Sequence, residues 1–230
     1  MEKEYFVDDY EKLVAALKSV DPIDVAMSKA VGGAYEIFGH IECQVLEQYG
    51  LANGMSVFDF GCGSGRLSTA ISQKWEIEYL GVDVVDDLLR FAASKAPSHY
   101  RFLLNHGLSI PVPDAFADIC CAFSVFTHLR HEDSYLYLTD LVRAAKPGGR
   151  IIFSFLEFAD PNHWTIFTDT VAARRQSVLP HLNVFIERNA ISRWAAHLGC
   201  PQVAFVDSHD PRWGGHALGQ SVAVLTKPAA

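Results

Sequence analysis

A glycine-rich segment gives this chain its clearest means of binding a ligand. Asp59 is followed by glycine at every second position, at Gly61, Gly63 and Gly65. An apolar run over residues 55–60 predicts a buried strand before the glycines, and helix-forming sequence follows them. Glycines adopt positive φ and let the backbone approach a ligand closely, while a helix N-terminus presents N–H groups. The segment is therefore predicted to hold a ligand; the alternative is a turn whose glycines serve packing alone.

The spacing of these glycines differs from the dinucleotide fingerprint G-x-G-x-x-G. The third glycine comes one residue early, and Arg66 stands where that fingerprint requires glycine. A nicotinamide-dependent oxidoreductase is therefore disfavoured, although it stays among the hypotheses.

A second acidic residue, Asp83, ends the next predicted strand, 18 residues after Gly65. A carboxylate at this position of a βαβ unit can accept hydrogen bonds from ribose hydroxyls. The alternative is that Asp83 caps the helix that follows. Asp86 is better placed for that cap, which leaves Asp83 for the ligand.

Polar residues follow the third and fourth predicted strands as well. The third strand runs into Asn105 and His106, and the fourth carries Ser124 and Phe126 near its end, followed by His128. Alternating strands and helices with short links predict a parallel, doubly wound sheet. Ligands of such sheets bind beyond the carboxyl ends of the strands. The four loops are therefore expected to converge on one site.

The remaining elements follow from periodicity and turn signals. Strands are predicted at residues 55–60, 79–83, 100–104, 118–126, 151–155, 203–206 and 221–225, and helices at 67–74, 86–95, 132–145 and 188–198. The last two strands permit an antiparallel hairpin. Residues 1–54 are predicted to form a helical segment that either covers the ligand site or packs on the sheet edge. Residues 158–182 are predicted to be an inserted region on the substrate side of a single domain, 1–230.

Composition limits the possible functions. The 230 residues are 50% hydrophobic and 20% charged, which fits one α/β domain with a substantial core. The formal net charge of -8 disfavours a nucleic-acid substrate. Five cysteines without a C-x-x-C pair suggest neither a disulfide framework nor a zinc site. No signal peptide and no apolar run of about 20 residues is visible, so a cytoplasmic protein is expected.

Over about residues 40 to 225 the sequence resembles the class I S-adenosylmethionine (SAM)-dependent methyltransferases. The resemblance is carried by residues 57–67, by Gly81-Val82-Asp83 and by residues 144–149, which are similar to the family's Leu-Lys-Pro-Gly-Gly turn. It implies a doubly wound, mostly parallel seven-stranded sheet with its last strand antiparallel and helices on both faces. It also implies SAM as cofactor and S-adenosylhomocysteine (SAH) as product.

The resemblance assigns roles position by position. The glycine loop would surround the methionine part of SAM, Asp83 would bind the ribose and Val84 would lie against the adenine. Related sequences often have an aspartate that meets the adenine amino group, and here either Asn105 or His106 takes its place. The expected cofactor-binding residues are Asp59, Gly61, Cys62, Gly63, Gly65, Asp83, Val84, Asn105, His106, Ser124 and Phe126.

Methyl transfer from a sulfonium is an in-line displacement in which the protein positions the nucleophile and excludes water. An oxygen nucleophile can also need a general base. His128 is the candidate, because it follows the fourth strand and imidazole titrates near neutral pH. The alternative is a structural histidine that bonds a loop carbonyl. The expected acceptor is a small molecule, a sugar or a natural product, methylated at oxygen; an inactive SAM-binding partner subunit is the alternative function.

Several other residues allow two interpretations each. His163, Trp164 and His181 would roof the substrate or simply pack, and Arg174 and Arg175 would hold an anionic substrate or face solvent. The loop with His209, Asp210 and His216 lacks standard metal-ligand spacing, so no metal is expected. His131 is expected to lie in an exposed turn. Neither nucleic acid nor membrane is expected as a partner, and the oligomeric state is left open.

Overall fold

A seven-stranded sheet forms the centre of the computed structural model, which describes residues 5–178 and 182–229. The strands run in the order β3-β2-β1-β4-β5-β7-β6. Their bounds are β1 Ser56–Phe60, β2 Glu78–Asp83, β3 Arg101–Leu104, β4 Ala117–Ala122, β5 Ala145–Phe155, β6 Val203–Val206 and β7 Ser221–Thr226. Strands β1 to β5 pair in parallel, while β7 is antiparallel to both β5 and β6. The predicted fold class is confirmed.

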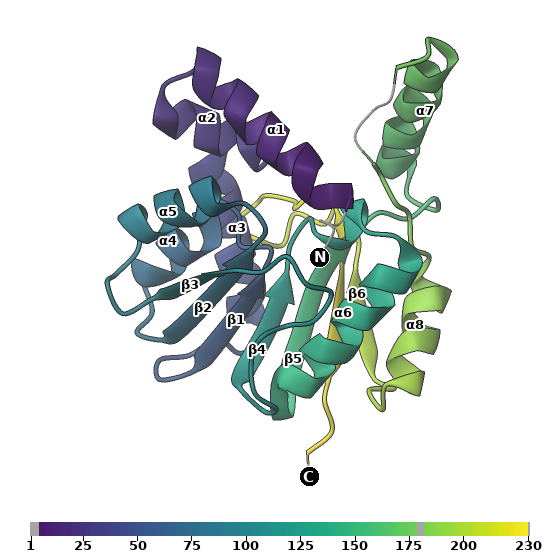
Figure 1. Ribbon diagram of the computed structural model, residues 1–230. Coiled ribbons are helices and arrows are strands. Elements are labelled where there is room, and N and C mark those ends of the chain that lie inside the picture. The colour runs from purple at the N-terminus through teal and green to yellow at the C-terminus, as the bar shows by residue number, and fades with distance from the viewer. Residues whose placement is uncertain (1–4, 179–181, 230) are drawn as a thin grey trace.

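Helices cover both faces of this sheet (Figure 1). Helices α3 (Tyr35–Gln48) and α4 (Arg66–Ser72) bury apolar side chains against one face. Helices α6 (His131–Ala144) and α8 (Arg188–His197) pack on the other face, and α5 (Asp86–Lys95) follows β2. Successive strand residues point to opposite faces, so Val57 contributes to one core and Phe58 to the other. Burial of both faces explains why the central strands are continuously apolar.

The order of the strands reverses at β1. This strand pairs with β2 on one side and β4 on the other, so the chain crosses over at their carboxyl ends. Such a switch point is where doubly wound sheets bind ligands. The glycine loop follows β1 directly and therefore lies at this point.

The fourth strand is shorter than predicted. It ends at Ala122, and Ser124 then adopts a left-handed backbone conformation with φ 58°. The Ser124 N–H donates to Ser154 Oγ on β5 at 2.7 Å, which holds the turn in place. Phe126–His128 form a single 3₁₀ turn, η1, rather than the end of a strand. The prediction that β4 reaches Phe126 was wrong, because this turn depends on a residue 30 positions away.

The N-terminal segment covers the carboxyl ends of the strands. Helix α1 (Tyr5–Val20) crosses above them, and α2 (Ile23–Ala30) lies beside it (Figure 1). Val14 and Met27 pack with Leu88 of α5 in a small separate core. Of the two alternatives for residues 1–54, covering the ligand site therefore applies to α1 and α2.

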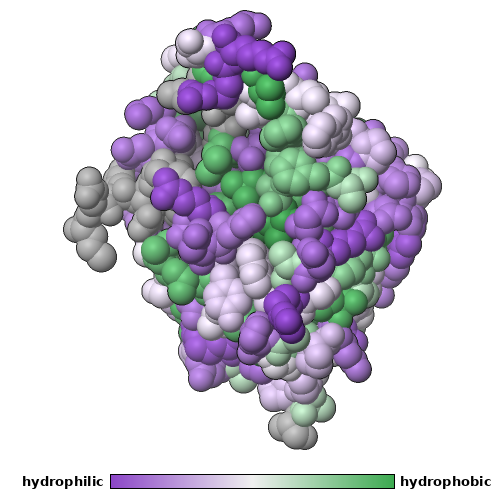
Figure 2. All heavy atoms as spheres, turned by 90° about the vertical axis from the view of Figure 1, so that its right-hand side faces the viewer, coloured by the Kyte–Doolittle hydropathy of each residue, from purple (hydrophilic) through white to green (hydrophobic). Residues whose placement is uncertain are grey.

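Helix α7 (Pro161–Arg175) projects from the body of the molecule (Figure 1). Asp160 caps it by accepting the N–H groups of Asn162 and His163 at 2.8 and 3.3 Å. Figure 2 shows hydrophobic side chains gathered on the face below this helix. Phe158, just before α7, stacks on Phe185 with 4.4 Å between the ring centroids. His181 lies outside the described residues.

Helices long and apolar enough to cross a membrane do not occur in residues 5–178 and 182–229.

Candidate functional site

A cavity of about 480 Å³ lies at the switch point of the sheet, under α1 and α2. This volume falls within the range of about 300 to 1,000 Å³ that is typical of small-molecule sites. Residues from the ends of β1, β2 and β4 form its floor, and Tyr10, Leu13, Ala30 and Val31 close it from the N-terminal helices. The loops that the sequence analysis expected to converge do meet here.

Two glycines of the loop after β1 lie against the cavity. Gly61 and Gly63 have φ values of 74° and 55°. An added Cβ would lie 2.3 Å from Val125 at Gly61 and 2.6 Å from Val31 at Gly63. Both glycines line the cavity, so they keep its wall open. Gly65, in contrast, precedes α4 and faces Ala92 of α5, outside the cavity lining.

Asp83 joins the end of β2 to the glycine loop. Its Oδ2 accepts the Gly63 N–H at 2.8 Å, and its Oδ1 accepts the N–H groups of Val84 and Val85 at 2.8 and 3.0 Å. Burial raises the pKa of this carboxyl, and the three N–H donors oppose the rise. Asp83 and Val84 both line the cavity. The carboxylate is therefore fixed in place, facing the space where a ligand would lie.

The expected capping role of Asp86 was wrong. Helix α5 has Val85 at its N-cap without a side-chain bond, and Asp86 pairs with Arg90 one turn later instead. The carboxylate that satisfies the N–H of Val85 is that of Asp83. Asp83 thus supports the start of α5 as well as lining the cavity.

The two candidates after β3 lie differently. Asn105 lines the cavity, with its Oδ1 accepting the Gly107 N–H at 3.1 Å. His106 bonds the carbonyl of Val84 through Nε2 at 2.9 Å and is not part of the lining. The arrangement favours Asn105 for contact with a ligand.

Ser124 and Phe126 are also separated. Ser124 lines the cavity, and its hydroxyl donates to Gln220 at 3.3 Å. Phe126 is fully buried in the core, with its ring centroid 4.7 Å from that of Phe153. The turn at Ser124 ends the strand alternation, so Phe123 and Val125 line the cavity where Phe126 was expected.

Asp59 and Cys62 form the inner wall of the cavity. Both are buried, and the Tyr79 hydroxyl donates to Asp59 Oδ2 at 2.5 Å. Burial raises the pKa of Asp59 from 3.8 to about 7, against the lowering effect of the Tyr79 hydrogen bond. This carboxyl is therefore expected to titrate near neutral pH.

Titration of Asp59 predicts a pH dependence of stability. The pKa of Asp59 is raised in the folded state. Its contribution to the free energy of unfolding is therefore complete below about pH 4 and is lost as pH rises through 7. Between these pH values Asp59 should make the free energy of unfolding of the wild type fall by up to about 1.4 kcal/mol per pH unit. The Asp59→Asn variant should lack this fall. Urea unfolding at a series of pH values measures it.

Burial also raises the pKa values of Glu42 and Asp83, so the wild-type decline combines several groups. The contribution of Asp59 is therefore the difference between wild-type and variant curves. Asp169→Asn, at an exposed position of α7, is the control. Parallel wild-type and Asp59→Asn curves would contradict the prediction.

His128 lies on η1 at the side of the cavity. Its Nδ1 donates to the carbonyl of Leu182 at 2.7 Å, because a carbonyl can only accept. The neutral ring therefore carries its lone pair on Nε2. Tyr10 of α1 packs edge-on against the imidazole with the ring centroids 6.0 Å apart. The bond to a loop carbonyl orients the ring and does not by itself decide between the two interpretations of His128.

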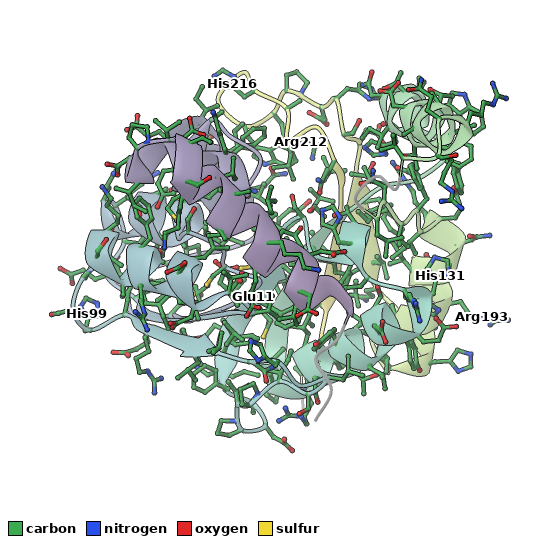
Figure 3. All side chains as sticks on the ribbon, turned by 45° about the horizontal axis from the view of Figure 1, so that its top comes forward. Glu11, His99, His131, Arg193, Arg212 and His216 are labelled. Atoms are coloured by element: carbon green, nitrogen blue, oxygen red, sulfur yellow. The ribbon has the colours of Figure 1, made fainter. Side chains whose placement is uncertain are left out.

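The other histidines among the described residues lie outside the cavity lining. His131 is exposed at the start of α6, near Arg193 of α8 (Figure 3). His163 is fully buried and bonded on both ring nitrogens, to the Glu157 N–H and to the Gly219 carbonyl. His163 therefore has a structural role in this fold.

The remaining candidates lie outside the lining of this cavity. Trp164 is half-exposed and packs on Phe158 and Phe167, and Arg174 and Arg175 are exposed. Arg212 and His216 lie in the loop between β6 and β7 (Figure 3), where Asp210 pairs with Arg212. Across the part of the chain that the structure describes, no group of three or more histidine, cysteine or acidic side chains could hold a metal.

Sequence reasoning did not identify six polar residues of the cavity wall: Tyr10, Lys29, Glu42, Arg66, Tyr137 and Gln220. Arg66 directly follows the glycine loop, a position that could have drawn attention to it. Tyr10 and Glu42 come from helices whose docking depends on contacts distant in sequence, so no local pattern identifies them.

Comparison with known proteins agrees with this architecture. Residues 58–153 match the family model described as "Methyltransferase domain". The O-methyltransferase rstn1 of Aspergillus nomiae is 25% identical over 126 residues, which cover 52% of this chain and 55% of the relative. The malonyl-[acyl-carrier protein] O-methyltransferase of Serratia marcescens is 30% identical over 135 residues, covering 57% and 51%. The chain thus spans about half the length of these curated relatives.

Solved structures share the fold over nearly the whole chain. Magnesium protoporphyrin IX methyltransferase (ChlM) of Synechocystis, with bound SAH, has a TM-score of 0.64 at 17% identity and covers 98% of this chain and 97% of its own. The methyltransferase in a complex with the Haloferax volcanii activator Trm112 has a TM-score of 0.67 at 16% identity and covers 99% of each chain.

A glycine loop and a strand-end carboxylate at the switch point of a doubly wound sheet define a nucleotide-binding α/β protein. Within that class, residues 58–153 match the methyltransferase family, and a solved methyltransferase with bound SAH shares the fold, which indicates SAM as the cofactor. The resemblance drawn from the sequence is confirmed, and the nicotinamide alternative is not supported. The cavity fits the cofactor, because Gly61 and Gly63 keep its wall open and Asp83 faces it with a carboxylate.

Proposed function

We propose that this chain transfers the methyl group of SAM to an oxygen atom of a small-molecule, sugar or natural-product acceptor. One observation carries the proposal: His128, with its ring oriented by the Leu182 carbonyl, lines the same cavity as Asp83 and the glycine loop. The names of two relatives, both O-methyltransferases, support oxygen as the methylated atom.

SAM, when bound, supplies a methyl group on a positively charged sulfur. The protein must bind and orient the reactants, exclude water and accept a proton. Asp83 would hold the ribose, the open backbone of the glycine loop would lie along the methionine part, and α1 with α2 would keep water from the cavity. His128 takes the proton of the acceptor hydroxyl at Nε2 as the oxygen gains its new bond to carbon. Neutral imidazole is suited to this step near pH 7.

Charge and partners fit a small acceptor. The net charge of -8 offers no general attraction for nucleic acid. One neighbouring structure is a complex with an activator protein, so a partner subunit is a further proposal for this chain. The oligomeric state is open, and the cytoplasmic location stays a prediction.

The cofactor part of the proposal is tested at Asp83. We expect Asp83→Ala to weaken SAH binding about tenfold or more, because a charged hydrogen-bond acceptor facing the ligand is lost. Isothermal titration calorimetry with SAH measures the change. Asp86→Ala is the matched control, since Asp86 is exposed, pairs with Arg90 and does not line the cavity. Unchanged SAH affinity in Asp83→Ala would contradict the site.

The acceptor part is tested by SAM turnover. The protein is incubated with radiolabelled SAM and separate panels of hydroxyl, carboxyl, amine and thiol compounds. Label in a hydroxyl or carboxyl product supports transfer to oxygen, whereas label only in amines or thiols overturns it. Tight SAM binding with no transfer to any panel would favour the inactive partner subunit.

A further inference from the structure

A glutamine in the cavity wall has no role in the function described so far. Gln220, directly before β7, lines the cavity, and its side chain reaches the loop after β4. Its Oε1 accepts the Ser154 hydroxyl at 2.6 Å and the Ser124 hydroxyl at 3.3 Å. Ser154 Oγ in turn accepts the Ser124 N–H. Two hydroxyls thus donate to one oxygen of Gln220, which fixes the carboxamide against the wall.

The backbone beside Gln220 is held as well as its side chain. The preceding residue, Gly219, donates its N–H to the Ser208 carbonyl at 2.9 Å and accepts from His163 Nε2 at 3.2 Å. His163 is fully buried, and its Nδ1 accepts the Glu157 N–H. The buried ring therefore orients the chain at the point where Gln220 enters the cavity.

The amide nitrogen of Gln220 is the part of this group that is left for a ligand. Its Nε2 bonds no other residue within the described ranges. A carboxamide nitrogen carries two N–H donors, and enclosed donors are nearly always bonded. The wall nearby is apolar, with Phe123, Val125 and Leu129. Once a ligand fills the cavity, an oxygen of that ligand is the natural partner for Nε2.

The order of the strands places Gln220 away from the cofactor residues. Asp83 ends β2 and the glycine loop follows β1, whereas Gln220 precedes β7, three strands from β1 in the sheet. Neighbouring strands lie ~4.8 Å apart, so β7 lies roughly 14 Å from β1. Ser221 is paired with Phe155, which puts the start of β7 at the carboxyl end of β5. Gln220 therefore lies beyond His128, on the side of the cavity left for the acceptor.

One short turn joins the anchor of Gln220 to the candidate base. Ser124 has a positive φ of 58°, and its carbonyl accepts the Thr127 hydroxyl at 3.1 Å. Strained backbone outside glycine tends to occur at functional sites. His128 is the next residue after Thr127, so the turn holds the base and the glutamine on the same wall.

We infer that Gln220 binds the acceptor by donating from Nε2 to a second oxygen, close to the hydroxyl that is methylated. The inference rests on the proposed function and narrows its acceptor to 1,2-diols and hydroxy-carbonyl compounds. The reacting oxygen is not the partner, because an N–H bond there would draw on the lone pairs that attack the methyl carbon. A compound with a single hydroxyl would leave the amide donors unbonded, which costs affinity.

Matched pairs of compounds test the second oxygen. Catechol and salicylaldehyde are each compared with phenol, and trans-1,2-cyclohexanediol is compared with cyclohexanol. Label transferred from radiolabelled SAM, measured over a range of acceptor concentrations, gives kcat and KM for each compound. We expect wild-type kcat/KM to be about tenfold or more higher for the member with two oxygens.

Two variants remove the amide donors. Gln220→Glu keeps an oxygen that can accept from both serines, and Gln220→Met adds no charge. In both, kcat/KM for the two-oxygen member should fall about tenfold or more, mainly through KM, because the bond exists before and during transfer. The value for the single-hydroxyl member and the affinity for SAH should stay at the wild-type level. Urea unfolding checks that both variants fold.

The matched control is Gln202→Glu. It makes the same change of charge at an exposed position directly before β6. Val203 pairs with Leu225, so this position lies at the end of the sheet opposite the cavity. All constants should stay at the wild-type level. A parallel loss for both members of a pair in the Gln220 variants, or an unchanged preference, would overturn the inference.

Failure of the proposed function gives a different result. If label enters no compound, or only amines and thiols, the proposed transfer to oxygen fails and this inference falls with it. If label enters carboxyl compounds alone, or hydroxyl compounds without preference for a second oxygen, the transfer stands and only the inference falls.

Discussion

His128→Asn is expected to lower kcat for methyl transfer by about 10²- to 10⁴-fold, the range typical of losing a general base. SAH affinity should not change. Asparagine places an N–H donor near the position of Nδ1, so the hydrogen bond to the Leu182 carbonyl can be kept. The variant therefore removes the base at Nε2 and retains the structural contact.

The two interpretations of His128 predict opposite results. If the histidine only holds residue 182, His128→Asn should turn over almost normally and His128→Gln should be the more damaged variant. If it is the base, both should be slow, and His128→Asn should lose the part of the pH–rate profile that reflects imidazole deprotonation.

The control for this experiment is His131→Asn. His131 also bonds a carbonyl of the same segment, that of Phe185, through Nε2 at 3.0 Å, and it lies outside the cavity lining. Its replacement should leave kcat unchanged. Equal losses in the two variants would show that the segment after α7, rather than the base, had been disturbed.

Arg188→Met is expected to destabilise the fold by about 3 kcal/mol. Glu157 is 2% exposed, and Arg188 donates to both of its oxygens, from Nε at 2.9 Å to Oε2 and from NH2 at 2.7 Å to Oε1. Ser221 donates to Oε1 at 2.5 Å. Loss of the guanidinium leaves a buried carboxylate with one hydroxyl donor.

The estimate lies at the lower end of the range for a broken buried pair, because the Arg188 side chain is itself 36% exposed. Urea unfolding of the intact chain measures the loss. Arg188→Met/Glu157→Gln should recover most of it, since the uncompensated charge is gone. Arg193→Met is the control, because Arg193 is exposed on the same helix and points away from the body (Figure 3). A loss as large in Arg193→Met would attribute the effect to α8 itself.

Local patterns were sufficient for the sheet and for part of the site. Helix α5 was predicted with its observed bounds, 86–95, and β6 with its observed bounds, 203–206. Apolar runs, glycine turns and acidic strand ends act over a few residues, so they are visible in sequence. Such local patterns identified Gly61, Gly63 and Asp83, and the structure brings all three to the cavity.

Long-range contacts account for the differences. The turn at Ser124 depends on Ser154, and it moves Phe126 from the expected wall into the core. The ion pair between Glu42 and Arg66 depends on how α3 docks against α4. None of these contacts has a signature within a window of neighbouring residues.

Enclosure of the cavity and stability of the scaffold are encoded in different parts of the chain. Every strand lies after residue 55, whereas Tyr10, Leu13 and Val31 belong to the segment that closes the cavity. Exposed ion pairs, Lys18 with Asp87 and Asp24 with Lys95, tie this segment to α5, and such pairs are individually weak. Substitutions at Tyr10, Leu13 and Val31 would therefore reshape the cavity without changing any residue of the sheet.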